Sequence, residues 1–491
     1  MQYRPHVLVA LLLYPLICHA QLPVYQSFEV DSAAGPRGGS TFLESFLSAN
    51  VHKPVAAQAA NVAGRVIVQG VVNPDGHLSN LRVVRGLRPD CDQEALRVMR
   101  LFNAWKPAQK DGKRVRQVVT YPVTYVLDAP LTYQNGQWIA YFDAKGNRVL
   151  NAGAAHFQHR TPVDSLTSLP TGDLTVLDVR DTVRREIARL PLVRQRIPWP
   201  VRQANPTGDA PLVWLGHRTA TGGWEGYRYG IDSAGRIRSR EQFTLHEHLY
   251  YNAAGMVTRI EQGRPSAETI REWHPNGQLS RLYEQQYTRQ GLITSPKHWL
   301  TAAWDSTGRP TVVAGTGYLI TQSTLLTSDG HAEQALLVEQ GPYEAGLKHG
   351  RWTGVAADSS YRYEENYRHG ELVSGKVYRA GQAPKRYSAC KAGPAFKGGF
   401  EAFQQFMKET VLYPLDAGLP YASGSVLVQF TVNPDGSLTD FDVVRSPHPL
   451  FSEQAIRALQ QTAGRWKPGT LRGEAVPVSV MMPVNFRKPI Y

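Results

Sequence analysis

The sequence predicts an α+β protein in which two small α-β-β-α-β domains flank a β-rich region of stacked antiparallel hairpins. Two observations lead to this prediction: one segment occurs twice, and short strands alternate with glycine turns between the two copies. The composition agrees, because 43 Gly and 33 Pro favour turn-rich β structure over long helices. At 491 residues the chain is long enough for about three domains.

The N-terminus is predicted to be a signal peptide covering residues 1–20. Arg4 precedes the apolar run Val7–Ile17, and Cys18-His19-Ala20 places small residues at the two positions that signal peptidase reads. The run is shorter than the roughly 20 apolar residues that span a bilayer. The alternative is an uncleaved membrane anchor. Cleavage would leave Cys91 and Cys390, and the sequence leaves open whether they pair.

The repeated segment is clearest around a shared Asn-Pro-Asp-Gly turn. Arg65–Gly76 reads RVIVQGVVNPDG, and Ser425–Gly436 reads SVLVQFTVNPDG. Matches in the same order are Gly38 with Gly398, Pro54 with Pro414, Gly64 with Gly424, Ala95 with Ala455, Trp105 with Trp466, Gly112 with Gly473 and Pro122 with Pro483. Residues 35–127 and 385–491 are therefore predicted to be two copies of one domain, called here the N-terminal and C-terminal domains.

Each copy is expected to contain the same elements. The first helix covers residues 41–50, with Thr41 and Glu44 at capping-box spacing and an apolar face that includes Phe46. A β-hairpin over residues 65–85 reverses at the Asn-Pro-Asp-Gly turn. A second helix begins with Asp92, or with Ser452 in the second copy, as its N-cap. The last strand covers residues 115–125 or 476–486, which completes a three-stranded antiparallel sheet backed by two helices.

The middle of the chain divides into two predicted parts. Residues 128–224 are expected to form a hairpin and a basic, Pro-rich linker, in which Val183, Ile187 and Leu190 hint at a short helix that Pro191 ends. Residues 225–384 repeat a strand, a polar glycine turn and a strand, as in Tyr251–Gly255. These hairpins are expected to stack into an extended antiparallel sheet, and they resemble MORN-type repeats.

Sequence motifs of catalysis and nucleotide binding are absent from the chain: it has no Gly-x-Ser-x-Gly, Walker or His-Glu-x-x-His pattern. The prediction is a non-enzymatic protein without a cofactor, a nucleic-acid partner or a small-molecule substrate. The net charge of +13 is interpreted as a solubilising surface. Two histidine pairs, His246 with His248 and His156 with His159, have spacings that metal sites use, but neither has a third ligand nearby in sequence, so no metal site is predicted.

The duplicated pattern resembles the TonB C-terminal domain family. The second copy fits best, with Tyr413-Pro414, Gly424–Phe430, Arg465–Gly469 and a closing strand that ends at Phe486. The first copy departs from the pattern, with His52-Lys53-Pro54 in place of Tyr-Pro and Gly70 in place of Phe430.

The resemblance implies a protein of the periplasm or cell envelope of a Gram-negative bacterium. It would bind the TonB box or plug of outer-membrane transporters by β-strand addition, in support of TonB-dependent transport. Pro122 and Pro483 lie inside the last strands, which fits edge strands. By resemblance, the contact residues of the second copy are Tyr413, Pro414, Val478, Val480, Met482, Val484 and Phe486. Two alternatives stay open: an anchored energy transducer driven by the inner-membrane proton motor, and a structural or peptidoglycan-binding scaffold.

Overall fold

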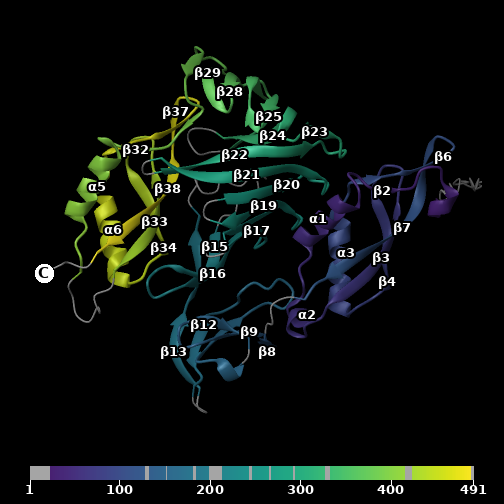
Figure 1. Ribbon diagram of the computed structural model, residues 1–491, viewed down its shortest axis with the longest axis horizontal. Coiled ribbons are helices and arrows are strands. Elements are labelled where there is room, and N and C mark those ends of the chain that lie inside the picture. The colour runs from purple at the N-terminus through teal and green to yellow at the C-terminus, as the bar shows by residue number, and fades with distance from the viewer. Residues whose placement is uncertain are drawn as a thin grey trace, which may run out of the picture.

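The computed structural model describes residues 23–127, 132–150, 152–180, 184–197, 213–242, 246–264, 267–290, 293–326, 332–414 and 423–487. The predicted signal peptide lies outside these residues. The fold is mostly β, with 54% strand and 14% helix, and large antiparallel sheets dominate it (Figure 1). Among the described helices, none combines the length and the apolar character that crossing a membrane requires.

The N-terminal domain is built around a small sheet with the strand order β1-β7-β3-β4. The hairpin predicted over residues 65–85 is present as β3 and β4, which pair antiparallel, and β7 pairs with β3 over its C-terminal part. The elements in chain order are β1 (Val24–Tyr25), β2 (Gly35–Pro36), α1 (Ser40–Asn50), α2 (Val55–Ala59), β3 (Gly64–Val72), β4 (Leu78–Arg85), α3 (Pro89–Leu101), β5 (Trp105–Lys106), β6 (Ala108–Lys110) and β7 (Lys113–Tyr125).

The C-terminal domain repeats this arrangement with the strand order β34-β33-β38. Its core is aromatic: Phe430 and Phe451 are fully buried, and Trp466 is nearly so. The elements in chain order are β31 (Lys391–Ala392), β32 (Ala395–Phe396), α5 (Gly399–Thr410), β33 (Gly424–Val432), β34 (Leu438–Arg445), α6 (Pro449–Gln460), β35 (Trp466–Lys467), β36 (Gly469–Leu471), β37 (Glu474–Val476) and β38 (Val478–Phe486).

The helix starts differ from the sequence prediction. Helix α1 begins at Ser40 after Gly39, whose backbone φ is 92°, and no side chain caps it, so the predicted capping box is wrong. Helices α3 and α6 begin at Pro89 and Pro449 rather than after Asp92 and Ser452. Proline suits the first helical position because its missing N–H would have no partner there and its φ is already helical. Helices α3 and α6 therefore start about one turn earlier than predicted.

The chain between the two domains forms two separate sheets. The first, with six strands among the described residues, contains β8 (Thr132–Gln134), β9 (Gln137–Phe142), β10 (Arg148–Val149), β11 (Phe157–Pro162), β12 (Leu174–Asp178) and β13 (Arg185–Leu190). Strand β13 occupies the segment where a short helix is predicted, so that prediction is wrong. The segment has no buried face to offer a helix, since Ile187 is 48% exposed, whereas pairing with β12 satisfies its backbone.

The second is a long sheet of seventeen strands among the described residues, in simple sequence order from β14 to β30. It extends beyond residues 225–384, because it begins at Leu192 and ends at Tyr387. Its strands are β14 (Leu192–Arg196), β15 (Val213–Arg218), β16 (Trp224–Ile231), β17 (Ile237–Gln242), β18 (Glu247–Tyr251), β19 (Val257–Arg264), β20 (Ala267–Trp273), β21 (Leu279–Gln290), β22 (Ile293–Trp304), β23 (Pro310–Val313), β24 (Thr316–Leu326), β25 (Ala332–Glu344), β26 (Leu347–Lys348), β27 (Gly350–Ala356), β28 (Tyr361–Arg368), β29 (Glu371–Arg379) and β30 (Lys385–Tyr387).

One five-residue turn recurs in the two domains and in both sheets between them. In Asn252–Met256 the amide of Asn252 donates to the Met256 carbonyl at 2.9 Å, and the amide of Gly255 donates back to Asn252 at 3.0 Å. The glycine takes a left-handed φ of 76°, which only glycine adopts at no steric cost. The same pair of bonds closes the turns at 73–77, 143–147, 232–236, 274–278, 305–309 and 433–437. A polar residue, two more residues and a glycine are therefore the local signal that sets each of these hairpins.

The N-terminal domain is docked on the long sheet, and α1 lies beside β19 and β20 in Figure 1. One continuous core contains Phe46 of α1 together with Tyr251 and Trp273 of the sheet. The buried Asn50 side chain accepts a hydrogen bond from the Val257 amide at 2.7 Å. The apolar face of α1 therefore packs against both the sheet of the N-terminal domain and the long sheet.

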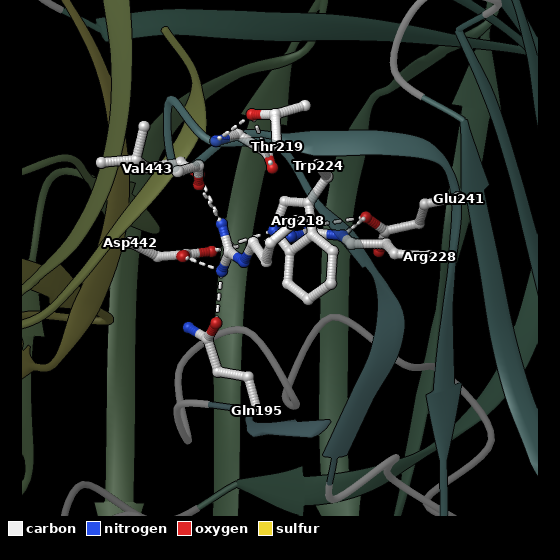
Figure 2. Close-up of polar contacts among 10 residues, drawn as sticks. Gln195, Arg218, Thr219, Trp224, Arg228, Glu241, Asp442 and Val443 are labelled. Carbon is white, nitrogen blue, oxygen red and sulfur yellow. Dashed lines mark hydrogen bonds and ion pairs between the residues drawn. The ribbon is translucent and has the colours of Figure 1, made fainter. Parts of the chain in front are cut away.

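The C-terminal domain contacts the long sheet near both of its ends. At one end, the Arg218 side chain of β15 donates to the Asp442 carboxylate and, at 2.7 Å, to the Val443 carbonyl of β34, while it lies over the Trp224 ring (Figure 2). At the other end, Arg472 bonds Glu365 of β28 at 3.0 Å and Glu339 of β25 at 3.1 Å. The domain therefore bridges the two ends of the sheet.

Candidate functional site

The last strand of the C-terminal domain, β38, is an edge strand. It pairs with β33 from Val478, opposite Val432, to Phe486, opposite Gly424. Within the described part of the chain, no strand pairs with its other side. Pro483 lies inside the strand opposite Leu427, and proline is tolerated in a sheet essentially only at edges or bulges. The backbone on the outer side of β38 is therefore an edge at which an extended peptide can pair.

Side chains along β38 alternate between the core and the surface. Four of the predicted contact residues, Val480, Met482, Val484 and Phe486, are each at most 5% exposed and pack in the core of the domain. The side chains that reach the surface are those of Met481, Pro483 and Asn485. The predicted residues of β38 are therefore mostly core residues, and the side chains that an added strand could contact on the accessible face are those of Met481, Pro483 and Asn485.

Sequence reasoning missed the outward-facing residues although the signal was present. Successive side chains of a strand point to opposite faces, so choosing every second residue from Val478 selects a single face. The hydrophobic members of that face, Val480, Met482 and Val484, belong to the core. Met481, at 41% exposure, is the large apolar side chain on the accessible face.

Of the three remaining predicted residues, Val478 is the half-buried first residue of β38, and Tyr413 and Pro414 come from the segment after α5. Tyr413 is partly buried, and its ring contacts that of Phe451 edge-on, with centroids 5.5 Å apart. Phe451 in turn stacks on Phe486 at 4.4 Å. Tyr413 is therefore linked through one aromatic ring to the end of the edge strand, and Pro414 follows it directly.

A buried charged cluster holds the opposite edge of the same sheet. Arg228 and His248 contact the Glu241 carboxylate at 2.6 and 2.8 Å, and Arg228 also approaches Asp442 of β34 at 3.9 Å (Figure 2). Burial alone would raise the pKa of Glu241, but the charges of Arg228 and His248 outweigh it and lower that pKa to about 2. The ionised cluster and the contact of Arg218 with Asp442 fix β34 against the long sheet.

The N-terminal domain has the same fold as the C-terminal domain, but its side chains differ at the position of Phe430. Gly70 occupies the position of Phe430, and a Cβ placed there would lie 3.0 Å from the Leu78 side chain and 3.1 Å from that of Leu81. The two leucines therefore approach the Gly70 backbone closely. Strand β1 pairs with β7 at Arg116 and Gln117, which covers the beginning of its outer edge.

Neither histidine pair found in the sequence belongs to a group of three possible metal ligands among the described residues. His156 precedes β11 and His159 lies within it, so their spacing of three residues is not helical. His246 contacts Glu268 at 3.8 Å, whereas His248 binds Glu241. Cys91 and Cys390 are both free thiols, and burial raises the pKa of Cys91 to about 11. Burial also raises the pKa of Cys390, so neither thiol has the lowered pKa that favours a nucleophile.

Comparison with known proteins defines the class of the two terminal domains. Residues 50–127 and 410–487 both match the family model described as Gram-negative bacterial TonB protein C-terminal. The chain thus carries two copies of this domain, as predicted. The match at 410–487 includes β33, β34, α6 and β38.

Other comparisons add little. No curated protein matches the chain. Among solved structures, the crystal structure of TcdB2-TccC3 is similar over 66% of this chain and 18% of that one, with 11% sequence identity and a TM-score of 0.16. This chain spans only that small share of the other's length, and so remote a likeness says nothing about function.

Proposed function

We propose that the protein is a non-enzymatic component of the Gram-negative cell envelope that binds outer-membrane transporters in support of TonB-dependent transport. The C-terminal domain captures an extended segment of the transporter, such as its TonB box, by β-strand addition to β38. The observation that carries this proposal is the outer edge of β38, with which no strand of the described residues pairs, in a segment that matches the TonB C-terminal family model. Export by a signal peptide at residues 1–20 is part of the same proposal.

The physical basis is the unused hydrogen-bonding capacity of the edge. Each backbone N–H and C=O on the outer side of β38 can bond an incoming strand, and the alternating side chains supply selectivity. Met481 and Asn485 face the accessible surface beside that edge. The edge is also held in place, because the core residues beneath it are buried and the far side of the sheet is docked through Arg218 and Asp442. A preformed edge loses less entropy on binding than a mobile segment would.

The test is a fluorescence-anisotropy titration of the full mature chain with labelled TonB-box peptides. Each peptide is used in its natural form and with N-methyl groups on alternate amides, which prevents backbone pairing. Met481→Lys places a charge on the accessible face, and its counterpart Thr120→Lys makes the same change on the exposed Thr120 of β7. Lysine beside an edge strand opposes strand addition.

We expect saturable binding of the natural peptide, at least about tenfold weaker in Met481→Lys and unchanged in Thr120→Lys. N-methylation that blocks one side of the peptide should abolish binding. Tyr413→Ala should also weaken it, because this ring supports the end of β38 through Phe451. Strand addition at β38 would be refuted if N-methylation left the affinity unchanged. It would also be refuted if the folded chain bound no peptide.

A further inference from the structure

Two turn tips of the long sheet bring two histidines and a glutamate together. The donor atoms of Glu344, His349 and His369 all lie within 4.8 Å of one another. Glu344 ends β25, His349 follows β26, and His369 lies at the tip of the hairpin formed by β28 and β29. These residues belong to neither terminal domain and take no part in the proposed strand addition.

The backbone holds the three residues in place. Ala345 and Gly346 both have positive φ, which forms the tight turn between Glu344 and Leu347. The His349 amide donates to the Pro342 carbonyl at 3.0 Å. The second tip is tied to the first, since the Gly370 amide donates to the Lys348 carbonyl at 2.8 Å. The imidazoles of His349 and His369 consequently lie with their ring centroids 5.2 Å apart.

The side chains are suited to a metal ion. His349 Nδ1 lies 3.0 Å from a Glu344 carboxylate oxygen. That nitrogen is shielded from solvent and has no aligned hydrogen bond with any described residue. The adjacent Lys348 directs its ammonium over the Trp352 ring at 3.9 Å. Glu344 and His369 are exposed at the surface, so their side chains are free to adjust.

We propose that Glu344, His349 and His369 form a binding site for a divalent transition metal, with Zn²⁺ as the fitting ion. Zinc accepts two imidazole nitrogens and one carboxylate oxygen and leaves its fourth position to water or to an outside ligand. Bond lengths near 2.0–2.2 Å place tetrahedral donor atoms roughly 3.3 Å apart. The present spread of up to 4.8 Å closes to that value by side-chain rotation. Ca²⁺ and Mg²⁺ fit poorly, because they prefer oxygen ligands throughout.

The test is a competition titration of the tag-free, full mature chain with ZnCl₂ against a chromophoric zinc chelator. His349→Ala removes one ligand, and His369→Asn removes another while retaining a residue that tolerates positive φ at the turn tip. Glu344→Gln removes the carboxylate charge at nearly constant size. The matched control is His77→Ala, because exposed His77 also lies beside a carboxylate, that of Asp75 at 3.4 Å, but does not belong to a three-ligand group.

We expect one equivalent of Zn²⁺ to bind the parent chain and His77→Ala alike. Loss of a ligand should weaken binding by more than about 100-fold in His349→Ala and His369→Asn, since even outer-sphere changes cost 10- to 100-fold. Unchanged unfolding temperatures in EDTA would show that the variants fold. Zinc should raise the unfolding temperature of the parent and of His77→Ala, but not that of His349→Ala or His369→Asn. No saturable binding, or binding that survives both histidine substitutions, would overturn the proposal.

Discussion

At the scale of single residues, the buried ion pair between Arg228 and Glu241 should make the stability of the fold depend on pH. Their side chains are only 3% and 8% exposed. The pKa of Glu241 is about 2 in the folded protein and near its ordinary 4.5 when unfolded. Stability from this carboxylate is therefore fully present above pH 4.5 and is lost as the pH falls toward 2.

We expect Glu241→Gln to lower the free energy of unfolding by roughly 3 kcal/mol at pH 7, because the buried Arg228 then loses its nearest carboxylate. The difference from wild type should shrink steadily between pH 4.5 and pH 3, as the native carboxylate loses its advantage. Urea denaturation, monitored by tryptophan fluorescence at each pH, would measure this difference in unfolding free energy. Glu186→Gln is the control, because its pair with Arg189 is exposed. If the difference in unfolding free energy between wild type and Glu241→Gln stayed constant with pH, the lowered pKa of Glu241 would be contradicted.

At the scale of elements, the recurring glycine turns allow a matched comparison. Gly255 and Gly277 occupy the same position of the same turn, with φ of 76° and 88°. A Cβ on Gly255 would meet nothing within 4 Å, whereas one on Gly277 would lie 2.9 Å from the Phe102 ring and 3.0 Å from that of Phe46. Gly277 therefore forms part of the contact between the long sheet and the N-terminal domain.

We expect Gly255→Ala to cost about 1 kcal/mol, which is the penalty of a left-handed alanine. Gly277→Ala should cost about 1–3 kcal/mol more, because the added methyl group overpacks the two rings. The unfolding temperatures of both variants, measured by scanning calorimetry, give the comparison. If both substitutions lowered the unfolding temperature equally, the methyl group added at Gly277 would not clash with Phe46 and Phe102.

The elements also show what the sequence can and cannot reveal. The hairpins were predictable because their turn chemistry is local: one polar residue and one glycine close each five-residue turn. The apolar face of α1 was predictable from the spacing of Leu43, Phe46 and Leu47, all of which are buried. Strand β13 was missed, because three apolar residues at helical spacing say nothing about the neighbouring strand that supplies backbone partners.

The candidate site was predictable only in part. The position of the edge strand follows from the repeat and from Pro483, but the choice of contact side chains selected the buried face. The group of Glu344, His349 and His369 was missed, because its ligands come from two hairpins that meet only when the sheet is assembled. Local sequence spacing carries no information about such contacts.

At the scale of the whole molecule, the C-terminal domain closes across the long sheet through residues far apart in the chain. Arg218 and Asp442 are separated by 224 positions, and no local pattern marks them as partners. Their contact is nearly dry, with side-chain exposures of 13% and 9%. A second attachment through Arg472 and Glu365 lies near the other end of the sheet.

Because the two attachments are separate, removing one should release one side of the domain without unfolding it. We expect Arg218→Ala to raise hydrogen exchange about tenfold or more in β34 and at the start of α6, where Ser452 donates to the Thr221 carbonyl at 2.6 Å. The central strand β33 should keep its protection, since the aromatic core and the Arg472 attachment are intact. Arg189→Ala, which breaks only the exposed pair with Glu186, should leave exchange unchanged. Equal loss of protection in β33 and β34 would mean that docking and folding of the domain are one event, and the domain would then present β38 only when it is attached at both ends.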